Sequence, residues 1–407
     1  MLITGLLLAN FVFAETDHEH NTPLPTSSDL SLHDVVEKTY QRNPRIQVMQ
    51  ARMKHIDAQL KSAQSLWPDD PAFSVSHYND EVMNSDGLLE WEVGMEMPLW
   101  LPGQKQARQN TIEQERSVVD SSEPVLKLEL AGLVREMLWN IALSKNQLDI
   151  AEKEWDIVKK LEQDVRKRVE LDDLAQSDLI LAQQESIAKE AALHMAQQEF
   201  GHAQHRYDMF TGLRILPANF EETAPAELTI TTEHPLLKRA QEKVTTSALQ
   251  RDQIKLEKRG NPSLFVGTRH ERATSSDEFA NAIGLNFSMP LGLSSHTTQK
   301  VTAAEVDLSE NKSEMELLFR DLNITIQDVS KELEATREQL EFAQRQNELS
   351  QKNLELSRKA FALGETSLIE LIRIQAQAFA VERNMHKKQL EVGLHTARLN
   401  QAKGIIP

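Results

Sequence analysis

The two halves of this 407-residue sequence are copies of each other. When the chain is compared with itself at an offset of 192 residues, matching side chains recur along both halves; upstream of the long helices the offset is 191. The matches include Leu126 with Leu318, Gln147 with Gln339, Arg166 with Arg358, and Gln183 with Gln375. Solenoid repeats are only roughly 20 to 50 residues long. The sequence therefore predicts two fused supersecondary units that share one architecture.

Each copy has the same order of parts: a helix, two short alternating segments, a very long helix, a tight turn and a returning helix. A helix of roughly 60 residues is a rod on the order of 90 Å long. The expected helices are about 30–66, 104–168 and 174–207 in the first copy, and about 235–258, 297–360 and 366–400 in the second. The predicted divisions are 1–14, 15–29, a first repeat 30–220 with strands in 71–98, and a second repeat 221–407 with strands in 262–290.

Local signals mark the start and the interruption of these helices. Ser31 with Asp34 three residues later is a capping pair for the first helix. Pro124 lies within the first long helical pattern and is expected to kink or restart it, because proline lacks the backbone N–H and clashes with the preceding turn. The corresponding position in the second copy is Glu316, and no break is expected there.

The short segments alternate as strands with one apolar face. In the first copy the intervening residues are Glu90, Glu92, Gly94 and Glu96, so the opposite face is acidic. A lipid face and a watery lumen would produce this pattern. The candidate lipid-facing residues are Leu89, Trp91, Val93, Met95, Phe279, Ile283, Leu285 and Phe287.

Four such strands cannot close a barrel, so the edges of the sheet must pair with other copies of the chain. Strands of about ten residues have the length of a tilted membrane strand. The alternative is a small soluble sheet that packs on the helices. Such a sheet would not explain helices of this length.

Composition and the N-terminus narrow the class of protein further. Residues 1–14 form an apolar run ending in Val-Phe-Ala, which predicts a secretory signal cleaved after Ala14. The formal charge of −17 disfavours nucleic acid and anionic lipid as partners. The absence of cysteine excludes disulfides, thiolate metal sites and a lipid-acylated N-terminal cysteine.

The strand pairs end in Met97-Pro98-Leu99-Trp100-Leu101-Pro102-Gly103-Gln104 and in Met289-Pro290-Leu291-Gly292-Leu293. The second hairpin tip reads Phe361-Ala362-Leu363-Gly364-Glu365-Thr366-Ser367-Leu368-Ile369-Glu370-Leu371. With the signal, the strands and the repeated hairpins, these motifs resemble the TolC family of outer-membrane factors (outer membrane efflux proteins) over nearly the whole chain. The first tip keeps the frame but has Asp172 where Gly364 stands in the second.

The resemblance implies a mixed α/β membrane protein with long antiparallel helical hairpins and four strands per chain. Three chains would form a homotrimer with one 12-stranded transmembrane β-barrel, continued by an α-helical tunnel into the periplasm. It also implies the outer membrane of a Gram-negative bacterium, a periplasmic adaptor (membrane fusion protein), and an inner-membrane pump such as an RND transporter. The implied function is passive conduction of substrates, with metal cations and drugs as the candidate classes.

The resemblance also assigns roles to the tips. Glu370 corresponds to the first position of an acidic ring at the pore constriction, whereas the second position is Arg373, a departure. The residues of the closed-gate latch correspond to Phe361 and Thr366, a second departure. Asp178 is a further constriction candidate because charge in a narrow pore focuses a field on cations. The candidates for adaptor docking are Asp172, Asp173, Phe361, Gly364, Glu365 and Thr366.

Catalytic signatures do not occur: there is no phosphate loop, no HExxH pair and no G-x-S-x-G elbow. We therefore expect neither an enzyme nor a cofactor. His18, Glu19 and His20 could bind a metal ion, but a solvated tail is the more common reading of such a segment. A soluble periplasmic coiled-coil adaptor or scaffold is the alternative function, because it would share the long hairpins. The strand pairs favour the channel.

Overall fold

The computed structural model describes residues 23–82, 86–291 and 295–407. The predicted signal and the His18-Glu19-His20 segment lie outside the described residues. The chain divides into two compact units. The first, which we call the hairpin unit, takes the described residues up to Thr39, together with Leu133–Thr223 and Glu332–Ala397. The second, the sheet unit, takes Tyr40–Gly132, Ala224–Lys331 and Arg398–Pro407. Both units draw on both halves of the sequence.

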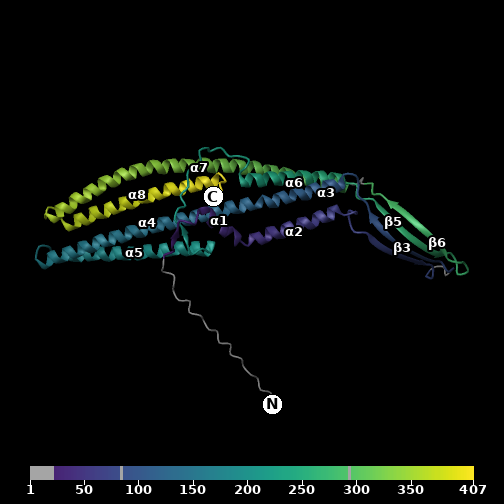
Figure 1. Ribbon diagram of the computed structural model, residues 1–407, viewed down its shortest axis with the longest axis horizontal. Helices are drawn as coiled ribbons and strands as arrows, with labels where there is room; N and C mark the ends of the chain where they lie inside the picture. Colours follow the sequence, from purple (N-terminus) through teal and green to yellow (C-terminus); the bar gives the residue numbers. More distant parts are fainter. Residues whose placement is uncertain (1–22, 83–85, 292–294) are drawn as a thin grey trace, which may run out of the picture. The chain divides into compact units, whose positions relative to one another are not determined.

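Helices make up most of both units (Figure 1). The hairpin unit holds β1 (Thr26–Ser27), most of α1 (Leu32–Gln41), most of α4 (Ser122–Glu170), α5 (Gln176–Thr211), β4 (Leu216–Pro217), the second part of α7 (Ser295–Ala362) and most of α8 (Leu368–Ala402). The sheet unit holds α2 (Arg45–Gln64), β2 (Ala72–Asn79), β3 (Leu89–Pro98), α3 (Gln104–Asp120), α6 (Pro235–Glu257), β5 (Ser263–Arg272), β6 (Ala280–Ser288) and the first parts of α4 and α7.

The capping pair at the start of α1 is confirmed. Asp34 N–H donates to the Ser31 hydroxyl at 3.1 Å, and Ser31 N–H donates to the Asp34 carboxylate at 2.9 Å. This reciprocal arrangement satisfies two backbone donors at the helix N-terminus. The hydrogen bonds from Ser31, first from its side chain and then from its backbone, lower the pKa of Asp34.

The expected single helix over 30–66 is wrong, because α1 ends at Gln41 and α2 begins at Arg45. Pro44 is the reason. It has no N–H to continue the first helix, yet its φ of −62° suits the start of the next. Arg45 N–H donates to the Asn43 side chain at 3.0 Å, which turns the chain between the two helices.

The prediction at Pro124 is confirmed. Helix α3 ends at Asp120 and α4 restarts at Ser122, so the proline lies in the first turn of a new helix. The Ser122 hydroxyl donates back to the Val118 carbonyl at 2.9 Å across the junction. In the second copy α7 runs unbroken through Glu316.

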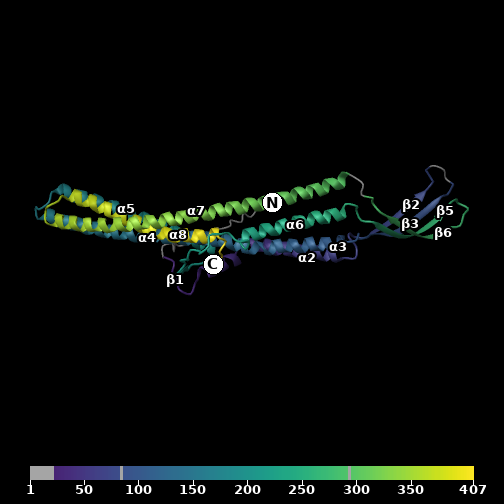
Figure 2. The ribbon, with the colours of Figure 1, turned by 90° about the horizontal axis from the view of Figure 1, so that it is seen from above.

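The strands of the sheet unit form one antiparallel sheet in the order β2-β3-β5-β6, as Figure 2 shows. The central pair β3·β5 joins the two halves of the sequence, and β2 and β6 are the edges within this sheet. Val75, Val93, Thr268 and Ile283 are direct partners across the four strands and fix the register. Because side chains alternate along a strand, this register collects Val75, Val93 and Ile283 on one face, together with the other predicted lipid-facing residues.

Helix α3 packs on both α2 and α6 in the sheet unit, with a small core of Ile56, Ala63 and Ile112. Trp139, Leu394 and Ala397 form one core of the hairpin unit, against which Phe220 packs. The short parallel pair β1·β4 was not expected from the sequence. No helix in the three described ranges is both long enough and apolar enough to cross a membrane.

Candidate functional site

The apolar face of the sheet is exposed to solvent. Trp91, Val93 and Met95 of β3 have 42%, 37% and 46% of their surface exposed, and Ile283 of β6 reaches 81%. The other predicted lipid-facing residues share this exposure or lie at its margin: Phe279, Leu285 and Phe287 are exposed, and Leu89 is half-buried. A contiguous apolar face of this size on a folded chain marks an interaction surface.

The opposite face is acidic and carries a row of glycines. Gly94, Gly267 and Gly284 are direct partners across β3, β5 and β6. The ring of Phe265 lies against the first two: a Cβ on Gly94 would come within 2.3 Å of its Cζ, and a Cβ on Gly267 within 2.6 Å. Phe265 therefore lies flat on the sheet. Spacing along the chain does not reveal this row, because cross-strand partners depend on the register of the strands.

Both hairpin tips close with the same backbone motif. In the first, the N–H groups of Asp172 and Asp173 donate to the carbonyls of Val169 and Arg168; in the second, those of Gly364 and Glu365 donate to Phe361 and Ala360. This is the Schellman arrangement, in which the residue after the helix takes a left-handed conformation. Gly364 does so with φ of 74° and Asp172 with φ of 58°. Within the described ranges, Asp172 is the one residue other than glycine with a positive φ. Aspartate tolerates this conformation better than most side chains.

The two tips contact each other within the hairpin unit through Arg168 and Phe361. The Arg168 guanidinium carbon lies 5.0 Å from the centre of the Phe361 ring, and its Nη1 donates to the Phe361 carbonyl at 3.4 Å. Arg168 Nε also donates to Asp173 at 2.7 Å. Phe361 is only 5% exposed and packs with Val165 and Leu371. Phe361, a docking candidate from the sequence, is thus a core residue of the tip within one chain, and its part in docking stays a prediction.

The remaining tip candidates are accessible. Asp172, Asp173, Gly364 and Glu365 are exposed, and Thr366 is half-buried. Asp178 is half-buried, and its carboxylate accepts from the backbone N–H of Ala175 at 3.3 Å. Asp178 thus caps the start of α5. This local role is available to it independently of any pore.

Glu370 and Arg373 lie one helical turn apart on α8 and form an ion pair. The hydrogen bond from Arg373 lowers the pKa of the Glu370 carboxyl. The Glu370 side chain is 41% exposed, so the pair is accessible at the surface of the hairpin unit.

A buried ion cluster, which was not expected from the sequence, joins three helices of the hairpin unit. The Glu154 side chain on α4 is 3% exposed; it accepts from Lys189 of α5 at 3.0 Å and from Arg383 of α8. One residue earlier, Lys153 pairs with Glu382 of α8 at 2.5 Å. The i, i+1 spacing of Lys153 and Glu154 hides this cluster from a motif search, because its partners come from distant helices.

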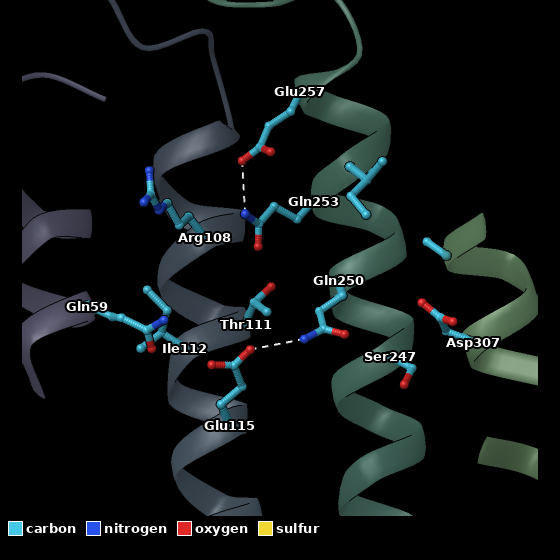
Figure 3. A pocket seen from close by; sticks show the side chains of 12 residues that line it. Gln59, Arg108, Thr111, Ile112, Glu115, Ser247, Gln250, Gln253, Glu257 and Asp307 are labelled. Carbon is cyan, nitrogen blue, oxygen red and sulfur yellow. Dashed lines mark hydrogen bonds between the residues drawn. The ribbon is translucent and has the colours of Figure 1, made fainter. Parts of the chain in front are cut away.

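A groove of about 440 Å³ lies between helices of the sheet unit (Figure 3). Glu115, Glu257 and Asp307 supply carboxylates to it. Two of them already accept hydrogen bonds from neighbouring amides: Gln250 donates to Glu115 at 3.0 Å, and Gln253 donates to Glu257 at 2.9 Å. Across the described parts of the chain, no three His, Cys, Asp or Glu side chains gather closely enough to hold a metal ion. We assign no ligand to this groove.

Comparison with solved structures decides what the fold is. CusC matches with a TM-score of 0.75 at 14% identity, covering 91% of this chain and 91% of its own. VceC from Vibrio cholerae matches with a TM-score of 0.72 at 14% identity, over 92% of this chain and 96% of its own. MtrE from Neisseria gonorrhoeae matches at 0.71 and 14% identity, over 92% and 88%. This chain has the fold of the outer-membrane efflux channels.

The efflux-channel fold is a mostly helical structure with a few strands, and the matches span nearly the full length of both chains. VceC is described as an outer membrane protein, and MtrE as an outer membrane channel. No protein-family model matches this chain, and no curated protein is significantly similar to it in sequence. The likeness therefore rests on three-dimensional structure.

Proposed function

We propose that this chain is one subunit of an outer-membrane efflux channel of the TolC type that conducts substrates passively. The observation that carries the proposal is the sheet: its apolar face is exposed while its other face holds Glu90, Glu92 and Glu96. An apolar outside and an acidic inside suit a wall between lipid and water. The efflux-channel fold supports the same conclusion.

Closure of the wall requires further copies of the chain. Among the described strands, the edge strands β2 and β6 each have one neighbour in the sheet. In lipid, every unpaired backbone group along such an edge costs several kcal/mol. Three chains with four strands each give the 12-stranded barrel of the proposed homotrimer. The helices would then lie in the periplasm.

The sequence repeat supports specific contacts between subunits. In the hairpin unit, Phe379 of α8 is 2% exposed and lines a small cavity together with Val158 of α4. At the offset of 192 residues, their counterparts are Ile187 of α5 and Ser350 of α7. Ile187 is 66% exposed, although its counterpart is buried. We infer that α5 of one subunit packs on α7 of the next, as α8 packs on α4 inside each chain.

A residue buried on α4 likewise has an exposed counterpart on α7, and the charges of one ion pair also recur at the offset of 192 residues. Ile150 on α4 is 5% exposed, whereas its counterpart Phe342 on α7 is 63% exposed. The ion pair between Lys153 and Glu382 corresponds to Arg345 and Glu190, which keep the same signs and are both exposed. An ion pair between Arg345 of one subunit and Glu190 of its neighbour would thus repeat the pair seen within the chain.

The proposed assembly is a tripartite efflux system with a periplasmic adaptor and an inner-membrane pump such as an RND transporter. The energy comes from the pump, so the channel subunit carries no catalytic site. The acidic sheet face fits cationic substrates, whether metal ions or cationic drugs. The proposed adaptor contacts are the tip residues Asp172, Asp173, Gly364 and Glu365, which are exposed, and Thr366, which is half-buried.

The test is reconstitution of the purified protein in planar lipid bilayers, together with fractionation of expressing cells. We expect discrete ion-conducting channels, a trimer in detergent, and retention in the outer membrane after a high-salt wash. The proposal would be overturned, in favour of the periplasmic adaptor or scaffold, if three results came together. The protein would be a monodisperse monomer in detergent, it would be washed off the membranes by high salt, and it would conduct no current in bilayers.

A further inference from the structure

Charge is segregated between the two faces of the sheet. The carboxylates of the four strands all lie on the polar face, and Arg269 on that face pairs with Glu90 at 2.9 Å. The other basic side chains of the strands, His77, His270 and Arg272, lie on the apolar face. His77 and His270 hydrogen-bond to the Glu90 carbonyl at 3.2 Å and to the Asn281 side chain at 2.6 Å. Hydrocarbon offers no partner to a guanidinium, so Arg272 calls for an anionic one.

The three basic residues gather at one end of the apolar face. His77 is opposite Trp91 and His270 is opposite Trp91 on the other side, while Arg272 is opposite Leu89. This end lies next to residues 80–82, 86–88 and 273–279, away from the end at which β3 leads into α3 (Figure 2). We call His77, Trp91, His270, Arg272 and Phe279 the basic rim.

Aromatic rings hold the basic rim together. The His77 and Trp91 ring centres are 4.1 Å apart, and His270 stacks on Phe279 at 4.2 Å with an angle of 11°. The Arg272 guanidinium carbon lies 5.1 Å from the centre of the Phe279 ring. No carboxylate of the described chain forms an ion pair with Arg272, and its buried Nε has no hydrogen-bond partner. Among the described residues, the Phe279 ring is therefore the contact that stabilises this guanidinium.

We propose that the basic rim binds the phosphate groups of lipid A in the outer leaflet of the outer membrane. The inference rests on the proposed function, because that function places the rim at the outer surface and the helices in the periplasm. Aromatic side chains favour the boundary between hydrocarbon and headgroups, and basic side chains at that boundary pair with anionic headgroups. Acyl chains on the apolar face and phosphates on the rim would be parts of one ligand.

The experiment measures the binding of lipid A to the purified, detergent-solubilised protein by native mass spectrometry. The probes are bis-phosphorylated lipid A and the same lipid without its phosphates; inorganic phosphate is a third arm. The test variant is the double substitution Arg272→Gln with His270→Gln. Arg269→Gln is the control, because it removes one guanidinium from the same strand on the opposite face.

We expect the wild-type protein to prefer the phosphorylated lipid by about tenfold. The double variant should lose the preference and Arg269→Gln should keep it, while excess inorganic phosphate should not displace the lipid. Equal affinity of the wild type for both lipids, equal loss in Arg269→Gln, or displacement by inorganic phosphate would each overturn the proposal. Channel conductance in phosphatidylcholine bilayers separates this failure from failure of the proposed function: a conducting wild type without lipid preference overturns only the lipid site.

Discussion

Arg373 holds the Glu370 carboxylate with two hydrogen bonds, Nη2 to Oε1 at 2.6 Å and Nε to Oε2 at 3.0 Å. Both oxygens of the proposed constriction residue are thus engaged by a cation three residues later on its own helix. The pair is nearly neutral as a whole. A ring of three such pairs would attract cations less than a ring of free carboxylates would.

We therefore predict that Arg373→Ala strengthens block of the channel by divalent or trivalent cations added from the periplasmic side, and that Glu370→Ala relieves it. The reason is that Arg373→Ala frees the carboxylate, while Glu370→Ala removes it. Single-channel conductance in planar bilayers, titrated with the cation, measures both effects. An unchanged blocking constant in Glu370→Ala, with reduced efflux in cells, would move Glu370 from the pore to the docking surface.

The sheet predicts a difference between neighbouring positions on β3. Val93→Arg places a charge on the apolar face, two residues further from the strand end than Trp91 of the basic rim, at a cost of about 2–4 kcal/mol if it lies at the membrane midplane and less toward the interface. Glu92→Arg changes the acidic face, which contacts water in the proposed barrel. We expect a much lower yield of outer-membrane trimer for Val93→Arg. Equal yields of the two variants would contradict the assignment of the two faces.

The repeat predicts an ion pair between subunits. Glu190→Arg should weaken the trimer because it faces Arg345 of the neighbouring subunit with a like charge, and adding Arg345→Glu should restore it. Trimer stability against heating in mild detergent is the readout. As the chain has no cysteine, Ile187→Cys with Ser350→Cys can add a direct test by a thiol cross-linker.

A cysteine pair within one chain is the control for this cross-link between subunits. The pair Ile187→Cys with Ser350→Cys should give species of two or three chains, whereas Val158→Cys with Phe379→Cys, the corresponding pair within one chain, should leave the chain monomeric on a denaturing gel. Absence of linked chains in the first pair, with efficient reaction of the second, would contradict the proposed packing of α5 on α7.

The Glu154 cluster predicts a large effect of one neutral substitution. Glu154→Gln removes the carboxylate that Lys189 and Arg383 share, and leaves Lys189 only its longer pair with Glu185 at 3.7 Å. The loss should cost about 3 kcal/mol, at the lower end of the range for broken buried pairs, because Lys189 keeps that partner and both cations retain some access to water. Asp149→Asn, in an exposed pair with Lys145, is the control and should cost less than about 1 kcal/mol. Denaturant unfolding compares the two; similar losses would mean that the cluster does not stabilise the hairpin unit.

His234 predicts a dependence of stability on pH. Its Nδ1 accepts from the Leu236 N–H at 3.2 Å at the start of α6, and burial lowers its pKa below 6.5. A lowered pKa means that folding favours the neutral ring, so its stabilising contribution is complete above about 6.5 and falls as the pH decreases toward the lowered value. We expect thermal stability to be unaffected by His234 above a pH of about 6.5 and to fall as the pH is lowered further. His234→Asn keeps a capping acceptor without titrating, and an unchanged pH profile in this variant would exclude His234 as the cause.

Much of the fold could be predicted from the sequence because its signals are local. The capping pair of Ser31 and Asp34 and the restart before Pro124 depend on neighbours within a few residues. Pro44 is equally local, but the helical pattern on both sides concealed the break. The tip motif likewise predicted the hairpin, although not that Phe361 is covered by Arg168 from the other tip.

The unpredicted features depend on pairing between distant segments. The partners of Glu154 lie on two other helices, and the basic rim exists only because β3 pairs with β5 in one particular register. A shift of one residue would move Arg272 to the acidic face. Such relationships follow from the packed structure and not from spacing along the chain.

The glycine row on the acidic face also bears on the cross-section of the channel. A line of three residues without Cβ atoms crosses β3, β5 and β6, and a sheet bends most easily where no side chains crowd its concave side. Each subunit would contribute one such bend in the sheet, partly covered by the flat aromatic ring of Phe265. With three bends around its circumference, the barrel would have a rounded-triangular cross-section at the level of the glycines. The narrowest passage at that level would then be set by the curvature of the backbone and by the Phe265 side chains, and not by the glutamates above and below.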